Sequence, residues 1–196
     1  MKFDEQPMRI IGLAGWSGAG KTTLIVKLIP RFLSRGLTVS TVKHAHHSFD
    51  IDQPGKDSYA HRQAGAMEVL VASNRRFALM HESGGARSPS LAGLLRKLSP
   101  VDLVIVEGFK REHHSKIEVH REQNGKPFLF PEDASICGLI SDCAPETISL
   151  PYGSINDLDA IVEMMWRYAE PLELTLERLA APRALPGKAV HGTIEQ

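Results

Sequence analysis

The sequence predicts an α/β fold, a three-layer sandwich in which helices cover a mostly parallel β-sheet. Two observations carry this prediction. The chain opens with an apolar strand, a glycine-rich turn, an amphipathic helix and a second strand, and this order requires a crossover between parallel strands. Farther along, Val101–Val106 is the most apolar segment, as expected for a strand in the middle of a parallel sheet.

The opening unit is defined by its apolar pattern. Met8–Ala14 is a short apolar run that leads into glycines, which indicates a buried strand. In Lys21–Arg35 apolar side chains recur at helical spacing, and Gly36 stands where a helix commonly ends. The β-branched segment Leu37–Val42 then predicts the second strand.

The rest of the chain supplies further elements of both kinds. After a polar, turn-rich stretch we expect a short helix and two strands, and Ser88-Pro89 is typical of a helix start. In chain order the expected elements are a helix at Ser58–Ala64, strands at Met67–Ala72 and Arg75–His81, a helix containing Leu91–Leu98, strands at Val101–Val106 and Ile136–Ile140, and a final helix from about Asn156.

One segment breaks this alternation and predicts an insertion on the sheet. Lys116–Glu122 and Lys126–Phe130 flank Asn124-Gly125, and this dipeptide is the strongest short-range signal for a tight hairpin turn. We therefore expect a β-hairpin inserted at about residues 115–131.

The length of 196 residues suits a single domain with a small appendage. We place the domain at residues 1–170. Beyond Pro171 the helical pattern weakens, and toward the end prolines and glycines gather while large apolar residues become few. Residues 171–196 are therefore predicted to form a mobile C-terminal tail.

The composition of the chain restricts its possible binding partners and its cellular compartment. The 23 Lys and Arg balance 23 Asp and Glu, which disfavours a nucleic-acid partner because no net positive charge is available. The apolar runs are far shorter than the roughly 18 residues that span a bilayer, so no membrane association is expected. No signal peptide is recognisable, and the two cysteines, Cys137 and Cys143, are expected to be incidental thiols. A cytoplasmic protein is predicted.

Residues 15–22 read G-W-S-G-A-G-K-T and satisfy the phosphate-loop pattern G-x-x-x-x-G-K-[ST] in full. The glycines let backbone N–H groups face phosphate oxygens, and the helix that follows adds the positive end of its dipole. Lys21 supplies a cation for the β- and γ-phosphates, and the Thr22 hydroxyl joins the shell of a bound Mg²⁺. The motif lies between a strand and a helix, so a P-loop NTPase fold is predicted. The predicted nucleotide-binding residues of this loop are Gly15, Ser17, Gly18, Ala19, Gly20, Lys21, Thr22 and Thr23.

An acidic residue at the end of the most apolar strand completes the predicted phosphate site. Glu107 directly follows Val106, so its carboxylate should emerge at the carboxyl edge of the sheet, where ligands bind in open α/β folds. There it would hold Mg²⁺ or orient an attacking water. Lys21 and Glu107 are the two predicted catalytic residues.

The histidine- and aspartate-rich segment after the second strand starts at the same edge of the sheet. We expect a switch-like loop in which Asp52 or Asp50 helps to hold Mg²⁺ together with Thr22 and Glu107, while Lys43 or His46 neutralises phosphate. Arg62, one short helix later, is a candidate contact for the γ-phosphate. A transition-metal site at the clustered histidines and an ordinary solvated loop are the alternative interpretations.

Three stretches resemble the MobB family, which takes part in molybdenum-cofactor guanylation: GWSGAGKTTL, then TVKHAHHSFDIDQPGKDSYAHRQAGA, then VDLVIVEGFK with the following KIEVHR. The resemblance implies a GTP-binding homodimer with weak Mg²⁺-dependent GTPase activity. It also implies an accessory role beside the MobA transferase, which joins GMP to molybdopterin. On this basis the phosphate loop is Gly15–Thr23, the strand-end acid is Glu107 and the second loop is Lys43–Asp52. Ser141-Asp142, after a predicted strand, is the nearest match to an Asn-Lys-x-Asp guanine reader.

Three other functions stay open from the residues. A small-molecule kinase would use the same phosphate loop with an acceptor pocket and an arginine lid. A metallochaperone-type GTPase would carry a metal on the His44–His47 segment. A scaffold with a vestigial loop would bind no nucleotide.

Overall fold

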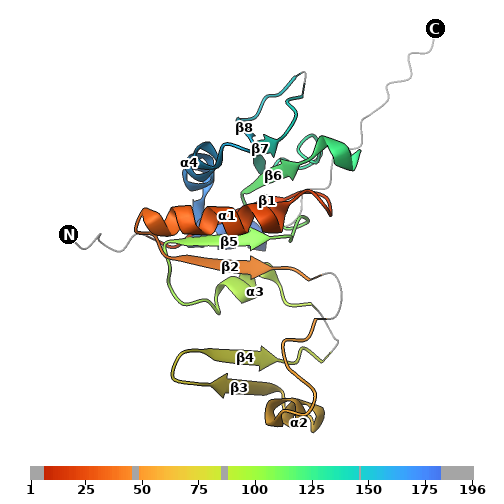
Figure 1. Cartoon of the computed structure of the whole chain (residues 1–196), viewed down its shortest axis with the longest axis vertical. Helices are drawn as coiled ribbons and strands as arrows, with labels where there is room; N and C mark the ends of the chain where they lie inside the picture. Colours follow the sequence, from red (N-terminus) through yellow and green to blue (C-terminus); the bar gives the residue numbers. More distant parts are fainter. Residues whose placement is uncertain (1–6, 46–48, 85–87, 146, 182–196) are drawn as a thin grey trace.

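The computed structural model describes residues 7–45, 49–84, 88–145 and 147–181. Its main sheet has the strand order β2-β5-β1-β6-β7-β8, and the short strand β9 pairs with the start of β1 (Figure 1). The strands of this sheet are β1 (Arg9–Ala14), β2 (Val39–Lys43), β5 (Leu103–Glu107), β6 (Lys116–His120), β7 (Ile136–Ser141), β8 (Tyr152–Ser154) and β9 (Glu170–Pro171). All neighbours along the order run parallel, and only β9 is antiparallel to its partner.

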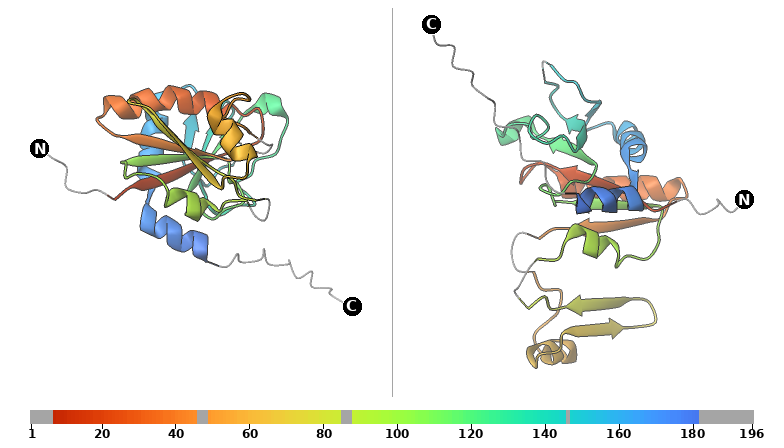
Figure 2. Two further views of the ribbon diagram at one scale, coloured as in Figure 1. Left: turned by 90° about the horizontal axis from the view of Figure 1, so that it is seen from below. Right: turned by 180° about the vertical axis from the view of Figure 1, so that it is seen from behind.

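Helices cover both faces of this sheet. On one face α1 (Lys21–Ser34) and α4 (Leu158–Tyr168) pack against alternate strand side chains such as Ile11 and Leu13. On the other face α3 (Leu91–Leu95) and α5 (Leu172–Ala180) pack against the intervening side chains, Ile10 among them (Figure 2). Successive strand side chains point to opposite faces, so the part of β5 that is covered on both faces, Leu103–Val106, is apolar throughout. The predicted three-layer α/β sandwich is confirmed.

A separate two-stranded antiparallel sheet stands beyond the edge strand β2 (Figure 1). It consists of β3 (Glu68–Ala72) and β4 (Phe77–His81), and α2 (Asp57–Gln63) packs beside it. Its tight connection is held by Ser73, whose backbone N–H and side-chain hydroxyl both donate to the carbonyl of Arg76. The inserted hairpin of this fold is therefore β3–β4.

The hairpin predicted at residues 115–131 is wrong. Its first arm is β6, a strand buried along its whole length between β1 and β7. The second arm is irregular because the buried Glu118 carboxylate accepts the backbone N–H groups of Leu129 and Phe130, which therefore pair with no strand. Gly125 adopts φ 55° and ends a 3₁₀ turn at Glu122–Asn124 instead of a two-residue hairpin turn.

The predicted tail also needs correction. Residues 172–180 form α5, and the backbone N–H of Leu172 donates to the carbonyl of Met8, next to β1. Leu172 and Leu179 pack against the cluster beneath α3. The sequence pattern missed this helix because it is short and its stability comes from packing under α3. The remaining tail, 182–196, lies outside the described residues. Within the described part of the chain, no helix has the length and apolarity needed to cross a membrane.

Candidate functional site

A large concave site lies at the carboxyl ends of β1, β2 and β5. It is an open cavity of about 1250 Å³, lined by the glycine-rich loop after β1, residues 43–45 after β2, residues 88–90 before α3 and residues 107–112 after β5. Neighbouring parallel strands end at the same edge, and the crevice outside those ends is where α/β sheets bind ligands. The volume exceeds the roughly 300–1,000 Å³ of a typical ligand pocket.

The loop between β1 and α1 depends on glycine at three positions. Gly15, Gly18 and Gly20 have φ values of 144°, 81° and 86°, a region that L side chains rarely adopt. At Gly15 a β-carbon would also lie 2.3 Å from the carbonyl oxygen of Val119 on β6. The loop therefore packs directly on the neighbouring strand, and α1 begins at Lys21 immediately after it.

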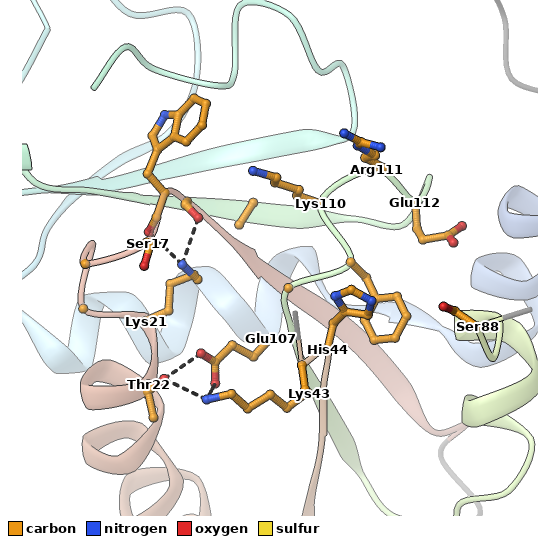
Figure 3. A pocket seen from close by; sticks show the side chains of 18 of the residues that line it. Ser17, Lys21, Thr22, Lys43, His44, Ser88, Glu107, Lys110, Arg111 and Glu112 are labelled. Atoms are coloured by element: carbon orange, nitrogen blue, oxygen red, sulfur yellow. Dashed lines mark hydrogen bonds and ion pairs between the residues drawn. The ribbon is translucent and has the colours of Figure 1, made fainter. Parts of the chain in front are cut away.

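Lys21 extends from the first turn of α1 back toward the loop. Its ammonium nitrogen donates to the carbonyl oxygens of Gly15 at 2.8 Å and Trp16 at 2.9 Å (Figure 3). Burial lowers the pKa of the Lys21 ammonium, and the carboxylate of Glu107 opposes this shift. The site thus presents a cation that is held at the mouth of the glycine loop.

Thr22 and Glu107 meet beside this lysine. The Thr22 hydroxyl donates to Oε1 of Glu107 at 2.6 Å, and Nζ of Lys43 lies 3.4 Å from Oε2 of the same carboxylate (Figure 3). Strand β5 lies between β1 and β2 and carries Glu107 to the edge of the sheet, where the glutamate side chain is only 14% exposed. A hydroxyl and a carboxylate are hard oxygen donors, so this pair fits Mg²⁺.

The cavity carries two further cations that sequence reasoning missed. Lys110 and Arg111 lie on the segment after β5 (Figure 3). The Lys110 ammonium stands 4.6 Å from the centroid of the Trp16 ring. Phe109 has the unusual φ of 48° and packs edge-on against the His44 ring, 4.9 Å between centroids. The sequence did contain a signal for these cations, because Lys110-Arg111 directly follows Glu107-Gly108-Phe109 at the end of a predicted strand.

Most of the predicted loop residues line the cavity. They are Gly15, Ser17, Gly18, Gly20, Lys21, Thr22 and Thr23. The methyl group of Ala19 is buried beneath the loop and is not part of the lining. His46 lies outside the described residues, while His44 contributes to the cavity wall.

Asp52 and Arg62 need correction, because the structure does not bring them to the cavity. The Arg62 guanidinium is bound by carboxylate oxygens of Asp50 at 2.8 Å, Asp52 at 3.2 Å and Glu82 at 2.8 Å. These contacts tie α2 to the segment before it, which carries Asp50 and Asp52, and to Glu82, which directly follows β4. In Figure 1 α2 lies beyond the edge strand β2, beside the β3–β4 hairpin, and neither Asp52 nor Arg62 lines the cavity that contains Thr22 and Glu107.

This combination of fold and site defines a P-loop protein. A parallel strand, a glycine loop and a helix begin the chain, Lys21 and Thr22 open the helix, and an acid from the adjacent strand meets the threonine. The chain belongs to the MobB family. The family model described as "Molybdopterin guanine dinucleotide synthesis protein B" matches residues 10–142.

Curated relatives agree with this assignment. The chain is 39% identical over 159 residues to the molybdopterin-guanine dinucleotide biosynthesis adapter protein of Escherichia coli (strain K12), covering 80% of this chain and 90% of the relative. It is 40% identical over 163 residues to the adapter protein of the same name from Haemophilus influenzae, covering 83% of this chain and 90% of the relative.

Solved structures agree as well. A crystal structure of molybdopterin-guanine biosynthesis protein B superposes with a TM-score of 0.62 at 26% identity, covering 81% of this chain and 98% of that protein. A Bacillus subtilis MobB structure, 21% identical, has a TM-score of 0.61 over 90% of this chain and all of its own, and supports the fold. The resemblance to the MobB family is confirmed.

Proposed function

We propose that this chain is an adapter protein of molybdopterin-guanine dinucleotide biosynthesis that binds Mg²⁺–GTP at its P-loop and hydrolyses the nucleotide slowly. Family membership and the names of its relatives support the adapter role. The proposal that this chain binds Mg²⁺–GTP depends above all on one observation: the Thr22 hydroxyl lies 2.6 Å from Oε1 of Glu107, in the cavity that Lys21 also lines. Its expected partners are a MobA-type guanylyltransferase and molybdopterin.

Each residue of the site has a role in this proposal. Lys21 binds the β- and γ-phosphates, which are stronger acceptors than the carbonyl groups it now contacts. Thr22 and Glu107 would hold Mg²⁺, which when bound offsets the negative charge of the phosphates. The Lys43 ammonium contacts the Glu107 carboxylate from the side of β2 and helps to orient it.

Hydrolysis is expected to be slow. Among the residues that the structure describes, the cations beside Thr22 and Glu107 are Lys21 and Lys43, whereas Arg111 lies across the cavity (Figure 3). An arginine that contacts the transferring phosphoryl group raises the rate by about 10³–10⁵. We therefore expect turnover on the order of 10⁻⁴ to 10⁻³ per second without a partner.

The test is calorimetric titration of the chain with GTP, ATP and GDP, with and without Mg²⁺. We expect GTP to bind more tightly than ATP. Mg²⁺ should strengthen GTP binding by about tenfold or more, that is at least about 1.4 kcal/mol. Glu107→Gln should keep metal-free binding and lose this Mg²⁺ effect, because an amide oxygen is a weaker ligand for a hard cation.

Glu112→Gln is the matched control, since Glu112 lines the same cavity at its other end. It should behave like the parent protein. An unchanged Mg²⁺ effect in Glu107→Gln would remove Glu107 from the metal site. Equal affinity for ATP and GTP would contradict the assignment of GTP.

The β3–β4 hairpin supports a homodimer. Leu70 pairs with Leu79 in register, so both side chains share one face with Phe77, and their exposed fractions are 62%, 48% and 73%. An isolated two-stranded sheet is marginally stable in water, and an apolar face of this kind marks an interaction surface. We propose that two copies of the chain cover this face mutually.

Leu70→Lys is expected to weaken self-association at least about tenfold, because a buried ammonium would face the apolar side chains of the second copy. Sedimentation equilibrium over a concentration series measures the dissociation constant. Leu174→Lys on α5 is the control, since Leu174 is similarly apolar and 41% exposed but belongs to a helix that packs on the main sheet and not to the hairpin. A monomeric parent protein, or equal dimerisation of both variants, would refute this interface.

A further inference from the structure

A second group of chemically active side chains lies outside the cavity described above. His120 is the last residue of β6, and Asp142 and Cys143 directly follow its parallel neighbour β7. Because the two strands end at the same edge, their terminal residues meet. One nitrogen, one oxygen and one sulfur atom of these three side chains all lie within 4.8 Å of one another.

The His120 ring is held in the orientation of a metal ligand. Its Nε2 lies 3.0 Å from the carbonyl oxygen of Lys126, and a carbonyl only accepts, so Nε2 donates this hydrogen bond. The other ring nitrogen, Nδ1, faces the Ser141 hydroxyl at 3.2 Å and the Cys143 sulfur at 3.9 Å. Metal-binding histidines commonly donate their second ring N–H to a carbonyl in this way.

The surroundings hold this ring in place. His120 is only 7% exposed, and the Phe128 ring packs on it with centroids 4.1 Å apart. Little side-chain motion is therefore available to the histidine, and an ion would bind to a ligand that is already oriented.

Asp142 and Cys143 are also oriented by neighbouring groups. The Asp142 carboxylate accepts the backbone N–H of Glu122 at 3.0 Å and lies 3.4 Å from Arg121. Each contact uses one of its oxygens, which leaves lone pairs for an ion. The backbone N–H of Cys143 donates to the Ser141 hydroxyl, which is fully buried beneath the sulfur atom.

We propose that His120, Asp142 and Cys143 bind a divalent transition metal of the Zn²⁺ class. Imidazole, carboxylate and thiolate are the ligands of zinc sites, whereas a thiolate disfavours Mg²⁺ and Ca²⁺. The three ligand atoms lie within 4.8 Å of one another, and such an ion forms bonds of roughly 2.0–2.3 Å to ligands of these kinds. Three protein ligands leave a fourth position for water or the Ser141 hydroxyl, and binding releases the thiol proton.

The metal would stabilise the segment that supports the phosphate loop. After His120 the chain passes the P-loop, where Trp16 donates its indole N–H to the carbonyl of Pro127 at 2.8 Å, and the Asn124 amide contacts the Ser17 carbonyl at 3.4 Å. An ion between His120 and the end of β7 would hold the base of this segment to the sheet. Binding should therefore change the fluorescence of Trp16.

The test is titration of the reduced full-length protein with Co²⁺, followed by displacement with Zn²⁺. Thiolate coordination gives Co²⁺ a charge-transfer absorption band that histidine and carboxylate ligands do not produce. We expect this band to saturate at one equivalent. Cys143→Ser should abolish it. Both Cys143→Ser and Asp142→Asn should weaken Co²⁺ binding at least about tenfold, because each change alters one of three protein ligands.

Cys137→Ser is the matched control, because the Cys137 sulfur bonds to the Lys116 carbonyl and the Ser115 hydroxyl, away from the cluster. This variant should keep the band and the affinity. Thermal unfolding of each variant verifies the fold. A band that survives Cys143→Ser would overturn the proposal, as would Co²⁺ binding without any thiolate band or no binding at micromolar concentration.

Discussion

Replacing Lys21 with alanine is expected to weaken binding of a nucleoside triphosphate by at least about 100-fold, or about 2.8 kcal/mol, while the fold persists. The Lys21 ammonium is the cation at the mouth of the glycine loop, and its two contacts are backbone carbonyls of that loop. Phosphate oxygens are charged acceptors and bind an ammonium more strongly than carbonyls do. Removing the side chain therefore affects binding far more than stability.

Calorimetric titration with GTP measures this effect, and thermal unfolding verifies the fold. Lys27→Ala is the control, because Lys27 lies two turns further along α1 with its side chain exposed. It should bind GTP like the parent protein. If Lys21→Ala instead lowered the stability of the protein and left the GTP affinity of its folded form unchanged, the lysine would have a structural role.

Gly15→Ala is expected to lower the free energy of unfolding by about 2–5 kcal/mol, which corresponds to a fall in melting temperature of about 5–20 °C. Two costs combine at this position. The backbone φ of 144° strains any L side chain, and the added methyl would lie 2.3 Å from the carbonyl oxygen of Val119. The oxygen belongs to β6 in the centre of the sheet, so it cannot move without displacing the strand.

Gly36→Ala separates the two costs. Gly36 also has a positive φ, 80°, but a methyl group there would meet nothing within 4 Å. Its expected loss is therefore the conformational term alone, about 1–2 kcal/mol. Denaturant unfolding compares the two variants directly. Equal losses at both glycines would mean that the P-loop does not depend on close contact with β6.

The predicted helices and strands are confirmed where the local sequence pattern allows only one kind of secondary structure. The alternation of β1, α1 and β2 was readable because apolar periodicity and glycine positions agree over neighbouring residues. At Asn124-Gly125 a strong turn signal gave the wrong topology, since β6 gains more from burial between two parallel strands than from a hairpin partner. Helix α5 was missed because its stability comes from packing under α3.

The candidate site divides in the same way. The P-loop could be predicted because its function depends on eight consecutive residues, and Glu107 could be added because a parallel strand brings its carboxyl end to a known edge. Asp52 and Arg62 could not be placed, since nothing local indicates that the chain after β2 leaves the sheet. The Arg62 charge is instead satisfied by three carboxylates near the hairpin.

Local chemistry alone therefore accounts for the strand–loop–helix unit, for its phosphate-binding residues and for the α/β class. Tertiary packing decided which distant groups meet: Glu107 with Thr22, Lys110 with Trp16, and His120 with Cys143. The physical reason is the distance along the chain over which each interaction acts. Backbone conformation and periodicity act over a few residues, whereas the order and register of parallel strands, set by burial across the whole sheet, determine which strand ends become neighbours.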